Sequence, residues 1–133
     1  MPPRLKKISP PKPTEAELAI LRVLWRRGPS TVREVWDEMQ SAQRAGYTTI
    51  LKLLQIMFQK GLVKRDATAR SHVFAATLTE EQTQQQVVGH MLDRIFAGSA
   101  RKLVMQALSV RKASAADVAE IRKLLDEMEG KSS

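Results

Sequence analysis

The sequence predicts a mainly α-helical protein with one small β-hairpin. Two threonine–glutamate capping patterns and a glycine stop mark three helices between Thr14 and Gly61. A short stretch of strand-forming residues around a polar turn follows directly. Apolar residues then return to helical spacing for most of the remaining chain. We therefore expect an N-terminal domain of three helices and a hairpin, followed by a helical C-terminal region.

The chain begins with a basic, proline-rich segment. Residues 1–13 contain five prolines and four Lys or Arg residues, a composition typical of an extended or disordered arm. Such an arm either contacts phosphates or is a solvated tail, and the sequence leaves both interpretations open. No apolar segment typical of a signal peptide follows, and no apolar run is long enough to span a membrane. We expect no membrane insertion.

Two capping boxes open the first two helices. Thr14 with Glu17, and Thr31 with Glu34, have the spacing at which the hydroxyl caps the helix and the glutamate returns to the cap backbone. A Gly-Pro pair ends the first helix. Apolar residues at helical spacing predict one buried face each, formed by Leu18, Leu21, Val23, Leu24 and Trp25 in the first helix, and by Val32, Val35, Trp36 and Met39 in the second.

The third helix is expected from Thr48 to Lys60, with Gly61 as its C-terminal cap. Its core face has the spacing i, i+3, i+4, i+7 and consists of Ile50, Leu53, Leu54 and Met57. Its opposite face is polar and consists of Thr48, Thr49, Lys52, Gln55 and Gln59. Leu51 and Phe58 interrupt this polar face. Leu51 suits contact with a thymine methyl group, and Phe58 is expected to pack on the wing or on the second domain.

The pattern changes from helical to alternating after Gly61. LVKRD and HVFAAT, on either side of the turn ATARS, predict two antiparallel strands whose inward residues are Val63, Val73 and Ala75. Three helices followed by a hairpin is the element order of a winged helix-turn-helix. We therefore assign residues 14–77 to such a domain.

In this fold the third helix lies in the DNA major groove, and the hairpin, or wing, approaches the backbone. Hydroxyl, amide and basic side chains suit base edges and phosphates. For Tyr47 two interpretations stay open: its hydroxyl donates to a phosphate, or its ring packs against Trp36. Arg70 is the expected wing tip, while Arg22, Arg26 and Arg27 are expected only to solvate the first helix. The residues predicted to bind double-stranded DNA are Arg33, Tyr47, Thr48, Thr49, Lys52, Gln55, Gln59, Lys64, Arg65 and Arg70.

Residues 78–129 predict three amphipathic helices, and residues 130–133 a tail. Thr79, Ser99 and Ser114 stand at the expected helix starts. Short amphipathic helices with few aromatic residues bury too little apolar surface alone, so we expect them to close against a second copy in a homodimer. The alternative is that they fold back on the first domain. The residues predicted to form the dimer interface are Val87, Met91, Ile95, Leu103, Val104, Leu108, Val118, Ile121, Leu124 and Leu125.

Charge is distributed unevenly along the chain. Residues 1–77 hold 14 Lys or Arg and six Asp or Glu, whereas residues 78–133 hold eight of each. This asymmetry indicates that the N-terminal part binds a polyanion.

Catalytic and metal-binding motifs are absent from the sequence. The lack of cysteine excludes a disulfide framework and a thiolate metal site. His72 and His90 have no partner at i+4, and there is no Gly-rich phosphate loop or nucleophile motif. We expect a protein that is not an enzyme and that holds neither a metal nor a cofactor.

Four stretches resemble the penicillinase repressor (BlaI/MecI/CopY) family. They are TEAELAILRVLW, TVREVWDEM, YTTILKLLQIMFQKGLVKRD and GSARKLV…IRKLLDE, and the resemblance runs from Pro13 to Met128. It implies a cytoplasmic bacterial repressor that binds as a dimer to a dyad-symmetric operator. In one branch of this family a membrane sensor metalloprotease system triggers cleavage of the repressor in its C-terminal region. In the copper-responsive branch, paired C-x-C motifs bind metal.

The chain departs from this family pattern in four places, one of which is its proline-rich arm of 13 residues, longer than the family's usual start. Without cysteine it lacks the metal site of the copper branch. Gln106–Ala107 stands where the cleaved branch has an Asn-Phe bond, which puts the proteolytic switch in doubt. Ile56 stands where the family commonly has arginine, so a different operator preference is expected.

The alternative function is a winged-helix module that binds an acidic protein partner, and Leu51 and Phe58 on the polar face favour it.

Overall fold

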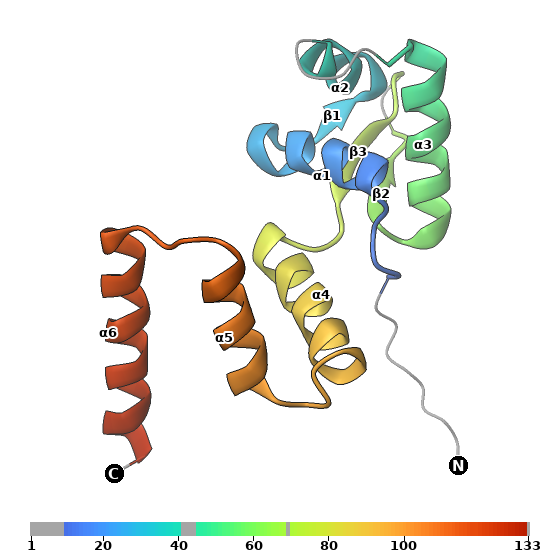
Figure 1. The fold of residues 1–133 in the computed structure, drawn as a ribbon. Helices are drawn as coiled ribbons and strands as arrows, with labels where there is room; N and C mark the ends of the chain where they lie inside the picture. The colour runs from blue at the N-terminus through green and yellow to red at the C-terminus, as the bar shows by residue number, and fades with distance from the viewer. Residues whose placement is uncertain (1–9, 41–44, 69, 133) are drawn as a thin grey trace, which may run out of the picture. The chain divides into compact units, whose positions relative to one another are not determined.

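The computed structural model describes residues 10–40, 45–68 and 70–132 (Figure 1). Most of the predicted arm, residues 1–9, and Ala69 of the wing turn therefore lie outside the described residues. The fold is mainly helical with one small antiparallel sheet, as predicted. The elements are α1 Glu15–Arg27, β1 Ser30–Thr31, α2 Val32–Met39, α3 Tyr47–Lys60, β2 Val63–Asp66, β3 Val73–Ala76, α4 Glu80–Arg94, α5 Ala100–Val110 and α6 Ala115–Ser132.

Both predicted capping boxes are present. The Thr14 hydroxyl accepts from the Glu17 backbone N–H at 3.2 Å, and the Thr14 backbone N–H donates to the Glu17 carboxylate at 2.9 Å. Thr31 and Glu34 form the same pair of hydrogen bonds at the start of α2. Each box satisfies backbone donors that have no partner inside the helix, which fixes where α1 and α2 begin.

Gly61 ends α3, as predicted. It has φ 84°, in the left-handed region, and its N–H reaches the carbonyls of the last helical turn. The chain reverses there, and β2 starts two residues later, at Val63. This reversal brings the base of the wing against the C-terminal turns of α3.

The sheet has three strands in the order β1-β3-β2. The two-residue strand β1 pairs with β3 and was not predicted. The predicted inward residues of β3 are also wrong: Phe74 is buried, whereas Val73 and Ala75 are only half-buried. Side chains alternate along a strand, so a shift of one residue exchanges the two faces. Val63 faces inward as predicted.

The core of the N-terminal domain lies between α1, α2, α3 and the sheet. Its fully buried side chains include Ile20, Val35, Ile50, Leu54 and Met57, and Phe74 closes it from the sheet. One carboxylate lies beside this core: Glu17 is 2% exposed and its Oε2 accepts from Lys60 Nζ at 2.7 Å. This ion pair ties the start of α1 to the end of α3.

Both tryptophans donate their indole N–H to a backbone carbonyl. Trp25 of α1 donates to Leu78, just before α4, at 2.9 Å. Trp36 of α2 donates to Ala45, just before α3, at 3.1 Å. Each indole therefore fixes the position of a segment that leads into a helix.

The chain divides into two compact units, Met1–Val88 and Gly89–Ser133. The first turns of α4 belong to the N-terminal unit, where Thr83 is buried and the Gln86 side chain donates to the Pro10 carbonyl. The division thus lies inside α4, later than the predicted boundary at 77/78. α6 continues to Ser132, so residues 130–132 extend a helix where a tail was predicted.

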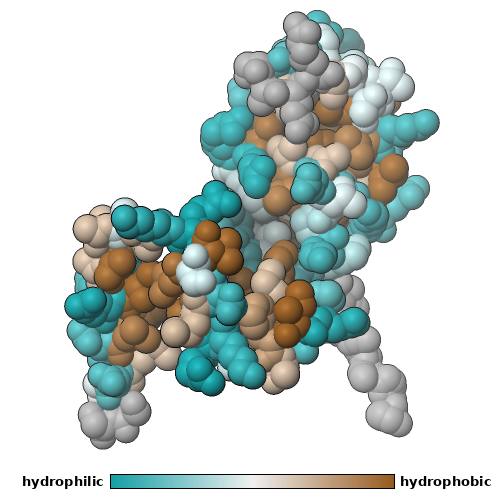
Figure 2. All heavy atoms as spheres, in the orientation of Figure 1, coloured by the Kyte–Doolittle hydropathy of each residue, from teal (hydrophilic) through white to brown (hydrophobic). Residues whose placement is uncertain are grey.

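The C-terminal unit contains the end of α4 and the helices α5 and α6. Ser114 caps α6 and Thr79 caps α4, as predicted, and Gln82 completes the cap of α4. Ser99 also caps α5. Its apolar side chains are mostly exposed, as the brown patches over α5 and α6 in Figure 2 show. Among the helices that the structure describes, none has the length and apolar character needed to cross a membrane.

Candidate nucleic-acid interface

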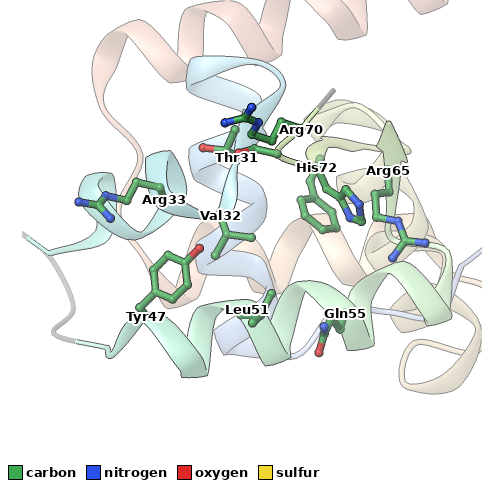
Figure 3. Close-up of a pocket in the computed structure, with 11 residues that line it drawn as sticks. Thr31, Val32, Arg33, Tyr47, Leu51, Gln55, Arg65, Arg70 and His72 are labelled. Carbon is green, nitrogen blue, oxygen red and sulfur yellow. The ribbon is translucent and has the colours of Figure 1, made fainter. Parts of the chain in front are cut away.

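A basic concavity opens between the start of α2, the outer face of α3 and the wing (Figure 3). It has a volume of about 320 Å³. Half of the ten predicted DNA-binding residues line it, namely Arg33, Tyr47, Gln55, Arg65 and Arg70. Segments far apart in the sequence therefore bring three arginines to one surface.

The other predicted residues lie on the surface outside this concavity. Thr48, Thr49, Lys52 and Gln59 are exposed along α3, so this helix has the predicted polar outer face. Lys64 is exposed on β2 and pairs across the sheet with Ala75. Because side chains alternate along a strand, Lys64 points to the face of the wing opposite to Arg65.

Tyr47 packs edge to face on Trp36, with ring centroids 6.0 Å apart and an interplanar angle of 75°. The tyrosine nevertheless stays 41% exposed, and its hydroxyl points toward Val32 at the concavity (Figure 3). The guanidinium of Arg33 lies 5.7 Å from the centre of the Trp36 ring. Trp36 therefore supports two polar side chains at the edge of the concavity, and packing of Tyr47 leaves its hydroxyl accessible.

Leu51 and Phe58, the two apolar residues on the polar face of α3, have separate structural explanations. Leu51 is half-buried, packs against the core and lines the concavity. Phe58 is 37% exposed and lies beneath the guanidinium of Arg65, which is 4.2 Å from the ring centre.

The wing turn carries an acidic residue as well as basic ones. Asp66 Oδ1 accepts from the backbone N–H of Thr68 at 3.0 Å and from its hydroxyl at 2.7 Å. The backbone hydrogen bond is the main cause that lowers the pKa of Asp66 below its ordinary value. Arg70, Ser71 and His72 follow this turn and line the concavity.

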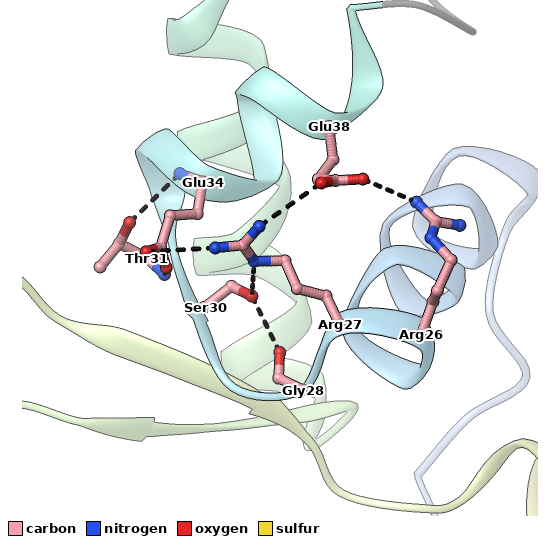
Figure 4. Close-up of polar contacts among 7 residues, drawn as sticks. All are labelled: Arg26, Arg27, Gly28, Ser30, Thr31, Glu34 and Glu38. Carbon is pink, nitrogen blue, oxygen red and sulfur yellow. Dashed lines mark hydrogen bonds and ion pairs between the residues drawn. The ribbon is translucent and has the colours of Figure 1, made fainter.

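Arg26 and Arg27 do more than solvate α1 (Figure 4). Arg26 pairs with Glu38 at 3.0 Å, and Arg27 pairs with Glu34 at 3.3 Å and with Glu38 at 3.4 Å. Arg27 also donates to the buried Ser30 hydroxyl at 3.1 Å. The charges of these two arginines are therefore neutralised by α2, in contrast to those around the concavity.

Several lining residues were not among the predicted site residues. They are Thr31, Val32, Leu51, Ser71, His72 and Phe74. The capping box at Thr31 marks the start of α2, and that start is one wall of the concavity, so a local signal existed for this residue. Phe74 depends on strand register, which the sequence did not settle. No cluster of His, Asp or Glu suited to a metal ion occurs in the described part of the chain.

Three helices, a short β1 strand and a two-stranded wing around a basic concavity define a winged helix-turn-helix protein, a class that binds DNA through its third helix. The model of the penicillinase repressor family matches residues 13–127 of this chain. The chain therefore belongs to the penicillinase repressor family, whose members are transcriptional repressors and not enzymes.

Two sequence relatives agree with this membership. The chain is 24% identical over 123 residues to a penicillinase repressor of Bacillus licheniformis, covering 92% of this chain and 94% of the relative. It is 28% identical over 120 residues to the transcriptional regulator BlaI of Mycobacterium tuberculosis, covering 86% and 83%. Among solved structures, it is similar to Bacillus licheniformis BlaI in complex with the blaP half-operator, with 26% identity, a TM-score of 0.48, and coverage of 58% of this chain and 92% of that one.

Proposed function

We propose that this protein is a dimeric bacterial repressor that binds a dyad-symmetric operator in double-stranded DNA. In this proposal α3 enters the major groove, the wing contacts the backbone, and the C-terminal unit holds two copies together. The protein acts in the cytoplasm, where the operator is. Membership in a repressor family supports the general role, while the DNA contacts and the dimer rest on this chain's own residues.

The basic concavity is the observation that carries the DNA-binding part. Arg33, Arg65 and Arg70 surround it, and no ion pair with a carboxylate neutralises them within the part of the chain that the structure describes. Phosphates provide most of the affinity in such an interface, while side chains on α3 select bases. Lys52 and Gln55, both exposed on α3, have groups that can read base edges.

The exposed apolar faces of α5 and α6 support the dimer. Leu124 and Leu125 are more than half exposed, at 55% and 54%, and Val104 is 45% exposed. Leu108, Val118, Ile121 and Leu125 also surround a hollow of about 190 Å³ within this unit. Proteins that stay monomeric rarely expose contiguous apolar surface of this kind, and a second copy would remove it from water.

A gel-shift titration against the DNA upstream of the protein's own coding sequence tests this function. We expect specific binding that weakens steeply with salt. Lys52→Ala should reduce affinity and relax the preference for that DNA over a scrambled duplex, because Lys52 lies on the reading face of α3. Lys123→Ala, on the polar face of α6, serves as the matched control. Binding without sequence preference, together with no effect of Lys52→Ala, would refute the proposal.

The alternative function, a winged-helix module that binds an acidic protein partner, loses its main support. It rested on Leu51 and Phe58 as exposed apolar residues on the polar face of α3. Leu51 packs against the core, and the Phe58 ring, although 37% exposed, lies under the Arg65 guanidinium. Ile56 also stays exposed on α3, at 41%.

Release by a sensor-triggered protease is the regulatory part of the proposal. The Gln106–Ala107 bond lies inside α5, with both side chains exposed. Cleavage there would require α5 to unwind locally, since helical backbone does not fit an extended protease cleft. The intact mass of the protein before and after induction tests this step: a fragment ending at Gln106 would support it, and an uncut chain in released protein would exclude it.

A further inference from the structure

The contact between Phe58 and Arg65 joins α3 to the wing. Arg65 is the third residue of β2, and its cross-strand neighbour is the buried Phe74. Its guanidinium carbon lies 4.2 Å from the centre of the Phe58 ring, within the range of a cation–π interaction. The reversal at Gly61 creates this contact, because it places β2 beside the last turns of α3.

Arg65 is held in a different way from Arg26 and Arg27. Those two arginines are fixed by carboxylates, which neutralise them. No carboxylate pairs with Arg65 among the residues that the structure describes. An aromatic ring attracts the cation without cancelling its charge. The five N–H donors of a guanidinium lie in its plane, so stacking on one face leaves them available.

We propose that Phe58 is a positioning residue that holds Arg65 ready to contact a DNA phosphate where α3 meets the wing. This inference rests on the proposed function. Arg65 lines the basic concavity and Phe58 does not, so Phe58 acts through Arg65. A free arginine loses rotamer freedom when it binds. The ring already restricts the rotamers of Arg65 in the free protein, so less side-chain conformational entropy is lost when DNA binds.

A double-mutant cycle tests the positioning role. The affinity for a mixed-sequence DNA duplex is measured across a salt series for the wild type, Phe58→Leu, Arg65→Ala and the double variant. Phe58→Leu should weaken binding about two- to fivefold per protomer, the order expected for a cation–π contact at an exposed position. Arg65→Ala should make the salt dependence shallower by about one counterion. In the Arg65→Ala background, Phe58→Leu should have no further effect.

Equal losses in both backgrounds would overturn the inference, since Phe58 would then contact DNA itself or support the fold. Phe58→Tyr keeps the ring and should retain wild-type affinity; a loss as large as that of Phe58→Leu would also contradict the proposal. A readout without DNA is the ring-current shift of the Arg65 side-chain protons by NMR. This shift should be present in the wild type and lost in Phe58→Leu, and its absence from the wild type would overturn the contact.

The outcomes separate the two proposals. A wild-type protein that binds no duplex at any salt concentration would overturn the proposed function together with the positioning role. Intact wild-type binding with an unchanged affinity of Phe58→Leu would overturn the positioning role alone.

Discussion

Glu17 illustrates how much one side chain can contribute to this fold. It closes the capping box of α1 and also pairs with Lys60 at the end of α3. Burial by itself raises the pKa of Glu17, but hydrogen bonds from Lys60 and Thr14 and the charge of Lys60 outweigh it, so the pKa lies below its ordinary value of 4.5. The ionised carboxylate therefore stabilises the folded state.

Replacement of Glu17 by glutamine should lower the free energy of unfolding at neutral pH by about 1–2 kcal/mol, since a charge-assisted hydrogen bond becomes a neutral one. Because the folded-state pKa is depressed, this contribution is complete above the unfolded pKa and disappears as pH falls through the folded pKa. Urea unfolding of wild type and Glu17→Gln at several pH values measures it. The difference in unfolding free energy between wild type and Glu17→Gln should become smaller below pH 4.5.

Glu15→Gln is the matched control, because Glu15 lies in the same first turn and is exposed. It should change stability little at any pH. A Glu17→Gln effect that is independent of pH, or equal to that of Glu15→Gln, would show that the ion pair with Lys60 does not stabilise the fold.

At the scale of elements, the helices of the N-terminal domain and the two hairpin strands follow from local signals, whereas β1 and the inward face of β3 do not. Thr14, Thr31 and Gly61 mark helix ends through hydrogen bonds to residues three or four positions away, which the sequence displays directly. β1 has two residues and exists through its pairing with β3. The burial of Phe74 likewise depends on a register that local alternation did not reveal.

The same distinction applies to the candidate site. The polar face of α3 follows from helical spacing, and the sequence predicted it. The Phe58–Arg65 contact requires α3 and β2 to lie side by side, and the ion pairs of Arg26 and Arg27 require α1 beside α2. Sequence spacing alone cannot predict which arginine meets a carboxylate and which stays free.

The wing makes its own prediction as an element. Arg70→Ala should weaken binding to all DNA sequences about equally and reduce the salt slope by about one, as expected for a phosphate contact. Fluorescence anisotropy with specific and scrambled duplexes measures both quantities. Arg26→Ala is the control, since its charge is already paired with Glu38. A loss confined to one operator base would show that Arg70 reads sequence.

At the scale of the whole molecule, the division inside α4 changes where the chain can be cut. A fragment ending at Thr77 lacks the Leu78 carbonyl that Trp25 binds and the buried Thr83. A fragment ending at Val88 keeps both. We expect the longer fragment to be monomeric and more stable to urea by about 1 kcal/mol, because the shorter one leaves the indole N–H of the half-buried Trp25 without its partner. Equal stability of the two fragments would place the end of the unit at Thr77.

A charged substitution on the apolar face of α6 tests whether this face forms the dimer interface. Leu125→Glu should raise the dimer dissociation constant by about 100-fold or more, since each copy would bury an unpaired carboxylate. Sedimentation velocity measures this change. Lys123→Glu introduces the same charge on the opposite side of α6 and should leave the dimer intact. A dimer that survives Leu125→Glu would mean that the apolar face of α6 is not the interface.

The two tryptophans, each held in place by its indole hydrogen bond, can serve as intrinsic fluorescent probes. The chain has two tryptophans, and each is fixed at a different junction: Trp25 at the segment leading into α4, and Trp36 beside Tyr47 and Arg33. A Trp25→Phe protein would carry a single tryptophan, Trp36, which lies beside Tyr47 and Arg33 at the edge of the basic concavity. Its emission would then follow occupancy of that surface, so unlabelled protein could report DNA binding in solution.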